Sequence, residues 1–174
     1  MMRRMPSPKR FRHAAIVGKP QAQGMRELLG EVAHFLTREG LDVALESATA
    51  QATGLAGYDA IDAEQLGRHC DLAVVVGGDG TMLGIARELA RWQVPLVGIN
   101  QGRLGFITDI AFGQYKEALA PMIAGDYEEE HRSMLEGDVW RWDGFVAAAH
   151  APSGAARRLA ERARLVDIEH ELEQ

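Results

Sequence analysis

One aspartate set among three glycines is the part of the sequence best suited to chemistry. Gly77-Gly78-Asp79-Gly80-Thr81 follows an apolar run at 72–76, and an amphipathic segment begins directly after it. Glycine lets a ligand approach backbone N–H groups, and a helix start directs unpaired N–H groups and a positive dipole end to the same place. The pattern predicts a phosphate-binding turn, in which Thr81 caps the helix or donates a hydrogen bond to a phosphate oxygen.

Asp79 is the unusual member of this turn, because a carboxylate repels phosphate. It needs a role there, such as accepting a proton or holding a divalent cation. The alternative is a purely structural role, since Asp and Gly are common turn residues. The tandem glycines, the buried strand before them and the helix after them favour the functional interpretation.

A second glycine-bearing loop, Asn100 to Gly105, follows the next apolar run at 94–99. Neither loop matches the better-known phosphate motifs. The sequence has no Gly-Lys-Ser/Thr of a P-loop and no Gly-x-Gly-x-x-Gly placed for a dinucleotide site.

Strand and helix patterns alternate along the first 125 residues. Strands are expected at 14–17, 41–45, 72–76 and 94–99, and helices from Met25 to about Gly40, from 82 to 92 and from 112 to 123. The segment 48–67 is expected to be a loop with a short helix. Alternation of this kind predicts an α/β fold with an open, mostly parallel sheet flanked by helices, which brings both glycine loops to the carboxyl ends of the strands.

The pattern changes after Gly125. Residues 131–141 and 145–150 are expected to form a hairpin around Asp143-Gly144, and the Ala/Arg/Glu-rich remainder is either helical from about 155 or disordered. The predicted division is a basic, disordered N-terminus at 1–12, an α/β nucleotide-binding domain at 13–126, the start of a β-rich second domain at 127–150 and a tail at 151–174.

Composition narrows the class of protein. The 174 residues carry a net charge of −6, which argues against a nucleic-acid partner. No apolar run reaches the ~18 residues that a membrane span requires, so we expect no membrane partner. A single cysteine, Cys70, favours a reducing cytoplasmic location, and no His/Cys spacing indicates a protein-held metal.

The two glycine loops together resemble the NAD kinase family. Gly77-Gly78-Asp79-Gly80-Thr81 alone is shared with diacylglycerol and sphingosine kinases, but the segment Gly98 to Phe106 at this spacing is similar to NAD kinases in particular. Arg132-Ser133-Met134-Leu135 resembles the segment that opens the family's β-rich second domain. The resemblance covers about 16–139.

The resemblance implies a transferase that moves the γ-phosphoryl group of ATP to the adenosine ribose 2′-hydroxyl of NAD, giving NADP. Asp79 matches the family's catalytic aspartate, which accepts the hydroxyl proton. The resemblance also implies a nucleotide site, a donor that is ATP or polyphosphate, a divalent cation such as Mg²⁺ held chiefly by the phosphates, and a homo-oligomer in the intact family. The nucleotide-binding residues are expected to be Gly77, Gly78, Asp79, Gly80, Thr81, Asn100, Gly102 and Phe106.

The sequence departs from the family after about Trp142. The Asn-Asp or Asn-Glu motif and the Gly-Ser-Thr-Ala-Tyr-type segment are not found. A truncation, a divergent gene end or an altered reading frame would explain this, and we favour the altered reading frame. We therefore expect weak NAD binding and impaired activity. Two alternatives stay open: a lipid kinase-like enzyme, and a nucleotide-binding module without turnover.

Overall fold

The computed structural model describes residues 11–19, 24–102, 105–108, 110–132, 139–140 and 160–161. The chain divides into two compact units, residues 1–129 and residues 130–174.

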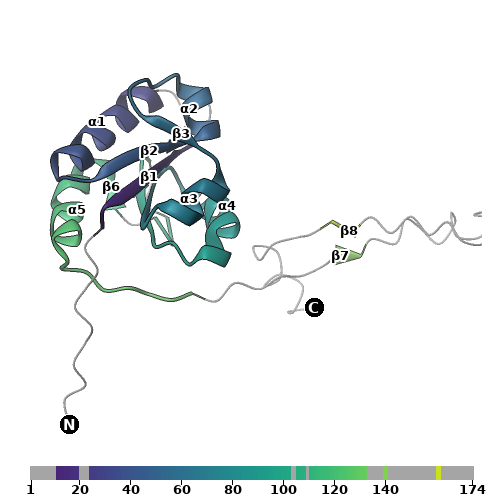
Figure 1. Cartoon of the computed structure of the whole chain (residues 1–174). Helices are drawn as coiled ribbons and strands as arrows, with labels where there is room; N and C mark the ends of the chain where they lie inside the picture. Colours follow the sequence, from purple (N-terminus) through teal and green to yellow (C-terminus); the bar gives the residue numbers. More distant parts are fainter. Residues whose placement is uncertain are drawn as a thin grey trace, which may run out of the picture. The chain divides into compact units, whose positions relative to one another are not determined.

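The first unit is built on a six-stranded parallel sheet (Figure 1). Its strands follow one another across the sheet in the order β3-β2-β1-β4-β5-β6. The strands are β1 (His13–Gly18), β2 (Asp42–Glu46), β3 (Asp59–Ile61), β4 (Leu72–Val76), β5 (Leu96–Asn100) and β6 (Ile110–Ala111). Every strand pair is parallel, so the predicted α/β class with an open parallel sheet is confirmed.

Helices cover both faces of the sheet (Figure 1). They are α1 (Met25–Arg38), α2 (Ser47–Thr53), α3 (Ala63–His69), α4 (Asp79–Leu89) and α5 (Tyr115–Ala124), with 3₁₀ turns η1 (Ala90–Trp92) and η2 (Phe112–Gln114). Apolar residues of α1 and α5 pack on one face in a single cluster with alternate residues of β1 and β4. Residues of α3 and α4 pack on the other face. The two layers explain why all five residues of β4 are buried.

The strand order reverses direction at β1 and β4, which are neighbours although two strands separate them in sequence. Ligands of open α/β sheets bind at such a reversal, outside the carboxyl ends of the strands. Backbone hydrogen bonds continue past the strands at this edge, from Lys19 N–H to the carbonyl of Val76 at 3.1 Å and from Gly77 N–H to that of Ile99 at 2.9 Å. The segments that follow β1, β4 and β5 therefore start side by side.

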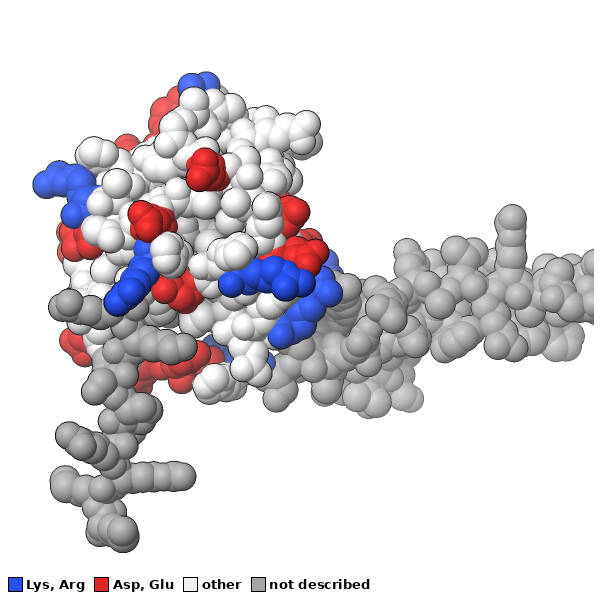
Figure 2. All heavy atoms as spheres, viewed as in Figure 1, with Lys and Arg blue, Asp and Glu red and all other residues white. Residues whose placement is uncertain are grey.

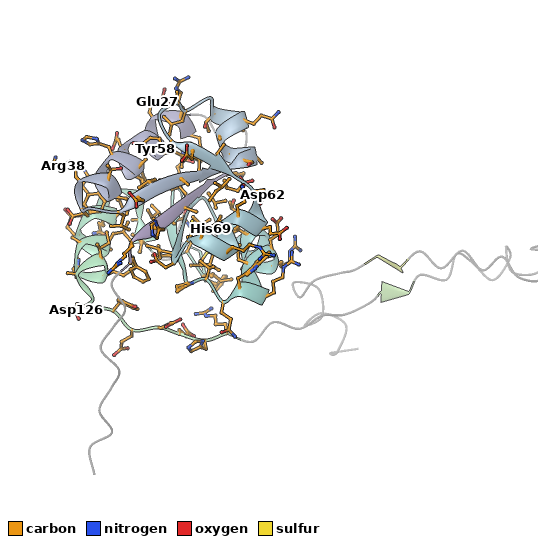
Figure 3. All side chains as sticks on the ribbon, viewed as in Figure 1. Glu27, Arg38, Tyr58, Asp62, His69 and Asp126 are labelled. Carbon is orange, nitrogen blue, oxygen red and sulfur yellow. The ribbon has the colours of Figure 1, made fainter. Side chains whose placement is uncertain are left out.

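The segment 48–67 was expected to be a loop with a short helix. The short helix is present as α2, but the loop assigned to the rest was wrong, because this part contains β3 and the start of α3. Glu46 caps α2 by accepting hydrogen bonds from the N–H groups of Ala48 and Thr49. Asp62 starts α3 with a capping box completed by Gln65, and Figure 3 labels Asp62 and His69 at the two ends of this helix. The Asp-x-x-Gln spacing was a readable signal, whereas β3 has only three residues and no apolar alternation.

The second unit contains a short antiparallel pair, β7 (Val139–Trp140) with β8 (Ala160–Glu161). Val139 and Trp140 fall within the predicted strand 131–141, but residues 131 and 132, also predicted to belong to it, are not part of a strand. The predicted partner strand 145–150 lies outside the described residues. The helix considered from 155 onward is wrong at residues 160–161, which are a strand, and its remaining residues are not described.

The described surface carries mixed charge. On the face shown in Figure 2, acidic and basic side chains are interspersed with uncharged residues, without a broad field of one sign. Among the described residues, no helix combines the length and the apolar character needed to cross a membrane.

A buried threonine joins α2 to the end of β1 and offers a test of this packing. The Thr49 hydroxyl accepts a hydrogen bond from Gly18 N–H at 3.0 Å and donates to the Glu46 carboxylate at 2.8 Å. Thr49→Val keeps the shape and leaves the Gly18 N–H unpaired, so we expect a loss of about 1–3 kcal/mol in the free energy of unfolding. Urea denaturation measures it. Thr49→Ser is the matched control that retains the hydroxyl, and equal losses in the two variants would contradict the role of this bond.

Candidate functional site

Asp79 is the first residue of α4, three positions earlier than the expected helix start at residue 82. Gly78 occupies the N-cap position in an extended conformation and provides no side-chain cap. Thr81 therefore lies inside the first helical turn, so the expectation that it caps the helix was wrong. Its backbone N–H donates to the carbonyl of Gly78 at 3.0 Å. The helix geometry leaves the N–H groups of Asp79 and Gly80 without a partner within the helix.

The side chain of Asp79 contacts the loop that follows β5. Its Oδ2 accepts a hydrogen bond from Phe106 N–H at 2.8 Å. Its Oδ1 accepts from the N–H groups of Ile107 at 3.2 Å and Thr108 at 3.0 Å, and from the Thr108 hydroxyl at 2.9 Å. Four donors thus surround one carboxylate, and they join the two glycine loops that the sequence singled out.

These donors change the acidity of Asp79. The Phe106 N–H makes the largest contribution to holding the pKa of the Asp79 carboxyl below its usual value, with the hydroxyl and N–H of Thr108 and the N–H of Ile107 adding to it. Partial burial acts in the opposite direction. A carboxyl with a lowered pKa is ionised at neutral pH, so the side chain is present as an anion that accepts hydrogen bonds.

The glycines around this carboxylate divide into two kinds. Gly105 is required by packing, because a Cβ there would overlap the Asp79 carboxylate. Gly77 is also required, since its Cβ would lie 2.7 Å from the Thr81 hydroxyl oxygen. By contrast, a Cβ on Gly78 or Gly80 would meet nothing within 4 Å, and neither residue has a positive φ. Packing among the described residues and backbone angle therefore give no reason for glycine at position 80, whereas glycine at position 78 suits the N-cap of α4.

Asn100 ends β5 and is buried, with 5% of its surface exposed. Its side-chain Oδ1 accepts a hydrogen bond from Gly102 N–H at 2.8 Å, which shapes the turn after the strand. Its Nδ2 donates to the Thr108 hydroxyl at 3.0 Å. Asn100 and Gly102 thus reach Asp79 through Thr108 and do not contact it directly.

Phe106 has the opposite environment, with 98% of its surface exposed, while its backbone holds Asp79. The structure therefore brings all the residues named from the sequence to one edge of the sheet. Among the described residues named from the sequence, Phe106 is the one that donates a hydrogen bond to the Asp79 side chain.

Three residues of this edge were missed by sequence reasoning. Thr108 carries a side-chain contact to Asp79, and Gly105 makes room for it. Lys19 follows β1 and is exposed beside the end of β4. The hydroxyl of Thr108 and the cation of Lys19 were readable as polar residues just past predicted strands or loops, but nothing in the sequence gave their contacts.

The site is an open edge of the sheet. Two hollows of the described surface lie elsewhere: one is lined by residues that include Glu39 and Ile123, and the other by residues that include Glu39 and Lys116. The described residues contain no group of three or more His, Cys, Asp and Glu side chains suited to a metal ion. Burial raises the pKa of the Cys70 thiol to about 11, with the Asp71 charge adding to it, so this thiol is protonated at neutral pH.

Comparison with known proteins now places the chain. Residues 14–127, which contain every residue proposed for the site, match the family model described as the ATP-NAD kinase N-terminal domain. The NAD kinase of Methylibium petroleiphilum is 67% identical over 135 residues, which cover 78% of this chain and 45% of that protein. The NAD kinase of Polaromonas naphthalenivorans is 50% identical over 163 residues, covering 94% of this chain and 56% of that protein.

The chain therefore spans about half the length of the curated relatives it matches. Among solved structures, the crystal structure of yeast NADH kinase complexed with NADH is similar, with a TM-score of 0.65. At 22% identity, over 78% of this chain and 45% of that one, this similarity concerns the fold. From its matched α/β domain and its curated relatives, the chain belongs to the NAD kinase family.

Proposed function

We propose that this chain supplies the phosphate turn and the proton acceptor of an NAD kinase. In this reaction the γ-phosphoryl group of ATP moves to the 2′-hydroxyl of the adenosine ribose of NAD, and Asp79 accepts the hydroxyl proton. The observation that carries the proposal is the ionised carboxylate of Asp79 at the start of α4, held by the loop 105–108 beside glycines that have open space around them.

Gly80 supports a ligand at this place. Glycine inside a helix costs conformational entropy, of the order of 0.5–1 kcal/mol relative to alanine, and Gly80 lies in the first turn of α4. Neither packing among the described residues nor a positive φ compensates for this cost at position 80. Close approach of a ligand to the backbone explains glycine at this exposed position.

The electrostatics of the edge suit phosphate. The unpaired N–H groups of Asp79 and Gly80 carry the positive end of the α4 dipole. The exposed Lys19 adds a full positive charge from the end of the neighbouring β1. Gly77, Gly78 and Thr81 complete the proposed phosphate turn.

Asp79 suits a proton acceptor because its low pKa keeps it ionised. Phosphoryl transfer has a loose transition state, in which the protein contributes mainly positioning and charge stabilisation. A strongly basic group is therefore not required. A side chain that holds the ribose hydroxyl in line and takes its proton fits the reaction.

A divalent cation, which we propose to be Mg²⁺, fits this site when it is bound chiefly by the phosphates of the donor. Three of the hydrogen bonds to Asp79 go to one oxygen, and the described residues offer no cluster of further carboxylates. When bound, the cation neutralises charge on the transferred phosphoryl group. The donor is proposed to be ATP, with polyphosphate as the alternative, and the working assembly a homo-oligomer.

Phe106 is proposed to pack against the nucleotide. A phenyl ring with 98% of its surface exposed gains nothing from the fold of the described residues, and its backbone is fixed by Asp79. A purine ring stacked on it would bury apolar surface on both partners. Asn100 and Gly102 are proposed to shape this edge through the turn after β5.

Asp79→Asn tests the catalytic proposal directly. We expect NADP formation from Mg²⁺, ATP and NAD to fall by at least about 100-fold, the usual contribution of a positioned base, while ATP binding measured by calorimetry persists. Enzymatic cycling of NADP detects even low turnover of the wild-type chain. Equal turnover in the two proteins would remove Asp79 from the mechanism.

The same assays distinguish the two alternative functions. Saturable ATP binding without formation of NADP supports the non-catalytic module. Transfer of labelled phosphate from ATP to diacylglycerol supports the lipid kinase alternative.

Gly80→Ala separates ligand binding from stability. Because a Cβ at position 80 meets no atom of the described residues within 4 Å, we expect the substitution to raise the free energy of unfolding by roughly 0.4–1 kcal/mol and to weaken ATP binding. Thermal unfolding and calorimetry measure the two effects. Gly84→Ala is the matched control on the same helix, since a Cβ at Gly84 also meets open space but lies one turn further along α4. Unweakened ATP binding in Gly80→Ala would contradict the proposed turn.

Phe106→Ala tests the nucleotide contact. We expect stability to stay within about 0.5 kcal/mol, as for other exposed positions, and nucleotide affinity to fall by about 1–3 kcal/mol, the usual loss when an aromatic partner of a base is removed. Phe106→Tyr keeps the ring and serves as the control. An unchanged dissociation constant in Phe106→Ala would exclude the ring from the site.

A further inference from the structure

A chain of buried hydrogen bonds ends on Asp79. The amide of Asn100 donates through Nδ2 to the hydroxyl of Thr108 at 3.0 Å, and that hydroxyl lies 2.9 Å from Asp79 Oδ1. Thr108 is fully buried and Asn100 almost so. Two buried polar side chains thus support one carboxylate that is itself partly open to solvent.

The direction of each bond in the chain is fixed. Gly102 N–H donates to Asn100 Oδ1, so the Asn100 amide must present its Nδ2 hydrogens to Thr108. A hydroxyl has one hydrogen. Since the Thr108 oxygen accepts from Asn100, its hydrogen is available for Asp79 Oδ1.

Thr108 occupies this place because β5 makes room for it. A Cβ on Gly98 would lie 2.7 Å from the methyl carbon of Thr108 and 3.2 Å from its Cα. Glycine at position 98 therefore lets the backbone and methyl group of Thr108 press against the strand. This contact sets the hydroxyl at a defined distance from Asp79.

The two oxygens of Asp79 are loaded unequally. Oδ1 accepts from Ile107 N–H, Thr108 N–H and the Thr108 hydroxyl, whereas Oδ2 accepts from Phe106 N–H alone. A carboxylate oxygen offers about two lone-pair sites. Oδ1 is fully used by the protein, and Oδ2 retains capacity for one more donor.

We propose that Thr108, oriented by Asn100, is a positioning residue that occupies Oδ1 of Asp79 and leaves Oδ2 as the atom that receives the ribose proton. This inference rests on the proposed function and deepens it to a named atom. The O2′–H bond breaks as its proton passes to Oδ2, the O2′–P bond forms, and the bond between the γ-phosphorus and the bridging oxygen breaks. ADP leaves with that electron pair.

Loss of the Thr108 hydroxyl has a defined electrostatic consequence. It removes one of the donors that hold the pKa of Asp79 down, so the pKa of this carboxyl rises in the variant. Asp79 is the one titratable side chain within 77–81, and residues 105–108 have none. Lys19, at the end of the neighbouring β1, is a charged side chain of this edge, and it is the same in the wild type and the variants. Arg103 and Asp109 flank the loop outside the described residues.

The test compares Thr108→Val with Thr108→Ser in the full chain. Carboxyl-carbon NMR follows the titration of Asp79, with its resonance assigned by its loss in Asp79→Asn, and the pH profile of NADP formation is recorded in parallel. We expect Thr108→Val to titrate at higher pH than the wild type, to shift the acid limb of the profile the same way and to lower kcat by about ten- to a hundredfold, with little change in KM for ATP. Thr108→Ser is expected to restore both the titration and kcat.

The outcomes separate the positioning role of Thr108 from the reaction itself. If Asp79 titrates at the same pH in Thr108→Val and in the wild type, the positioning role is overturned, even if NADP formation depends on Asp79. If Asp79 titrates at higher pH in Thr108→Val and at the wild-type pH in Thr108→Ser, the positioning role of Thr108 is supported, even if no variant makes NADP. Should Thr108→Val fail to fold by circular dichroism, Thr108→Cys, a weaker donor of intermediate size, must raise the titration, and an unchanged value overturns the proposal.

Discussion

The contact between the Asp79 carboxylate and the backbone N–H groups of residues 106–108 is the constraint on which the site depends. It joins two loops that are 27–29 residues apart in sequence. It also determines the ionisation of the carboxyl, since the Phe106 N–H is the main cause of its lowered pKa. Without this contact, the turn after β4 would present only glycines and a helix start. With it, the turn presents an anion of fixed position beside a place for phosphate.

The sheet makes this contact possible. Parallel pairing of β4 with β5 sets the ends of the two strands at one edge, and the hydrogen bond from Gly77 N–H to the Ile99 carbonyl carries the alignment one residue further. Both faces of β4 are covered by helices, so the strand cannot shift without disturbing two apolar clusters. Glycines 98 and 105 then allow the loop after β5 to approach β5 and Asp79 more closely than any other residue would. The rigid part of the domain thereby positions a site made mostly of backbone.

Much of this could be predicted from the sequence, and the failures have physical causes. The apolar run 72–76 and the helical stripe after Met82 gave β4 and most of α4 correctly, because period and burial are written in side-chain type. The start of α4 was placed three residues late, since an Asp-Gly pair indicates a turn as readily as a first helical turn. The segment 48–67 misled because small residues hide short helices and a three-residue strand. Thr108 could not be found, because its role depends on a contact across the sheet and not on local pattern.

The hold on Asp79 has a consequence for how such a site can vary over evolution. Three residues, 106–108, donate hydrogen bonds to Asp79. Phe106 and Ile107 do so through the main chain alone, so their side chains can be replaced without changing which groups hold the carboxylate. Phe106 points its ring to the outside, while Ile107 packs toward α4 and the core. Side-chain atoms of this segment therefore determine ligand preference at the outer surface, whereas its main-chain atoms determine the geometry of the Asp79 carboxylate. Selection can revise the first without rebuilding the second, whereas Gly105 and Thr108 leave no such freedom.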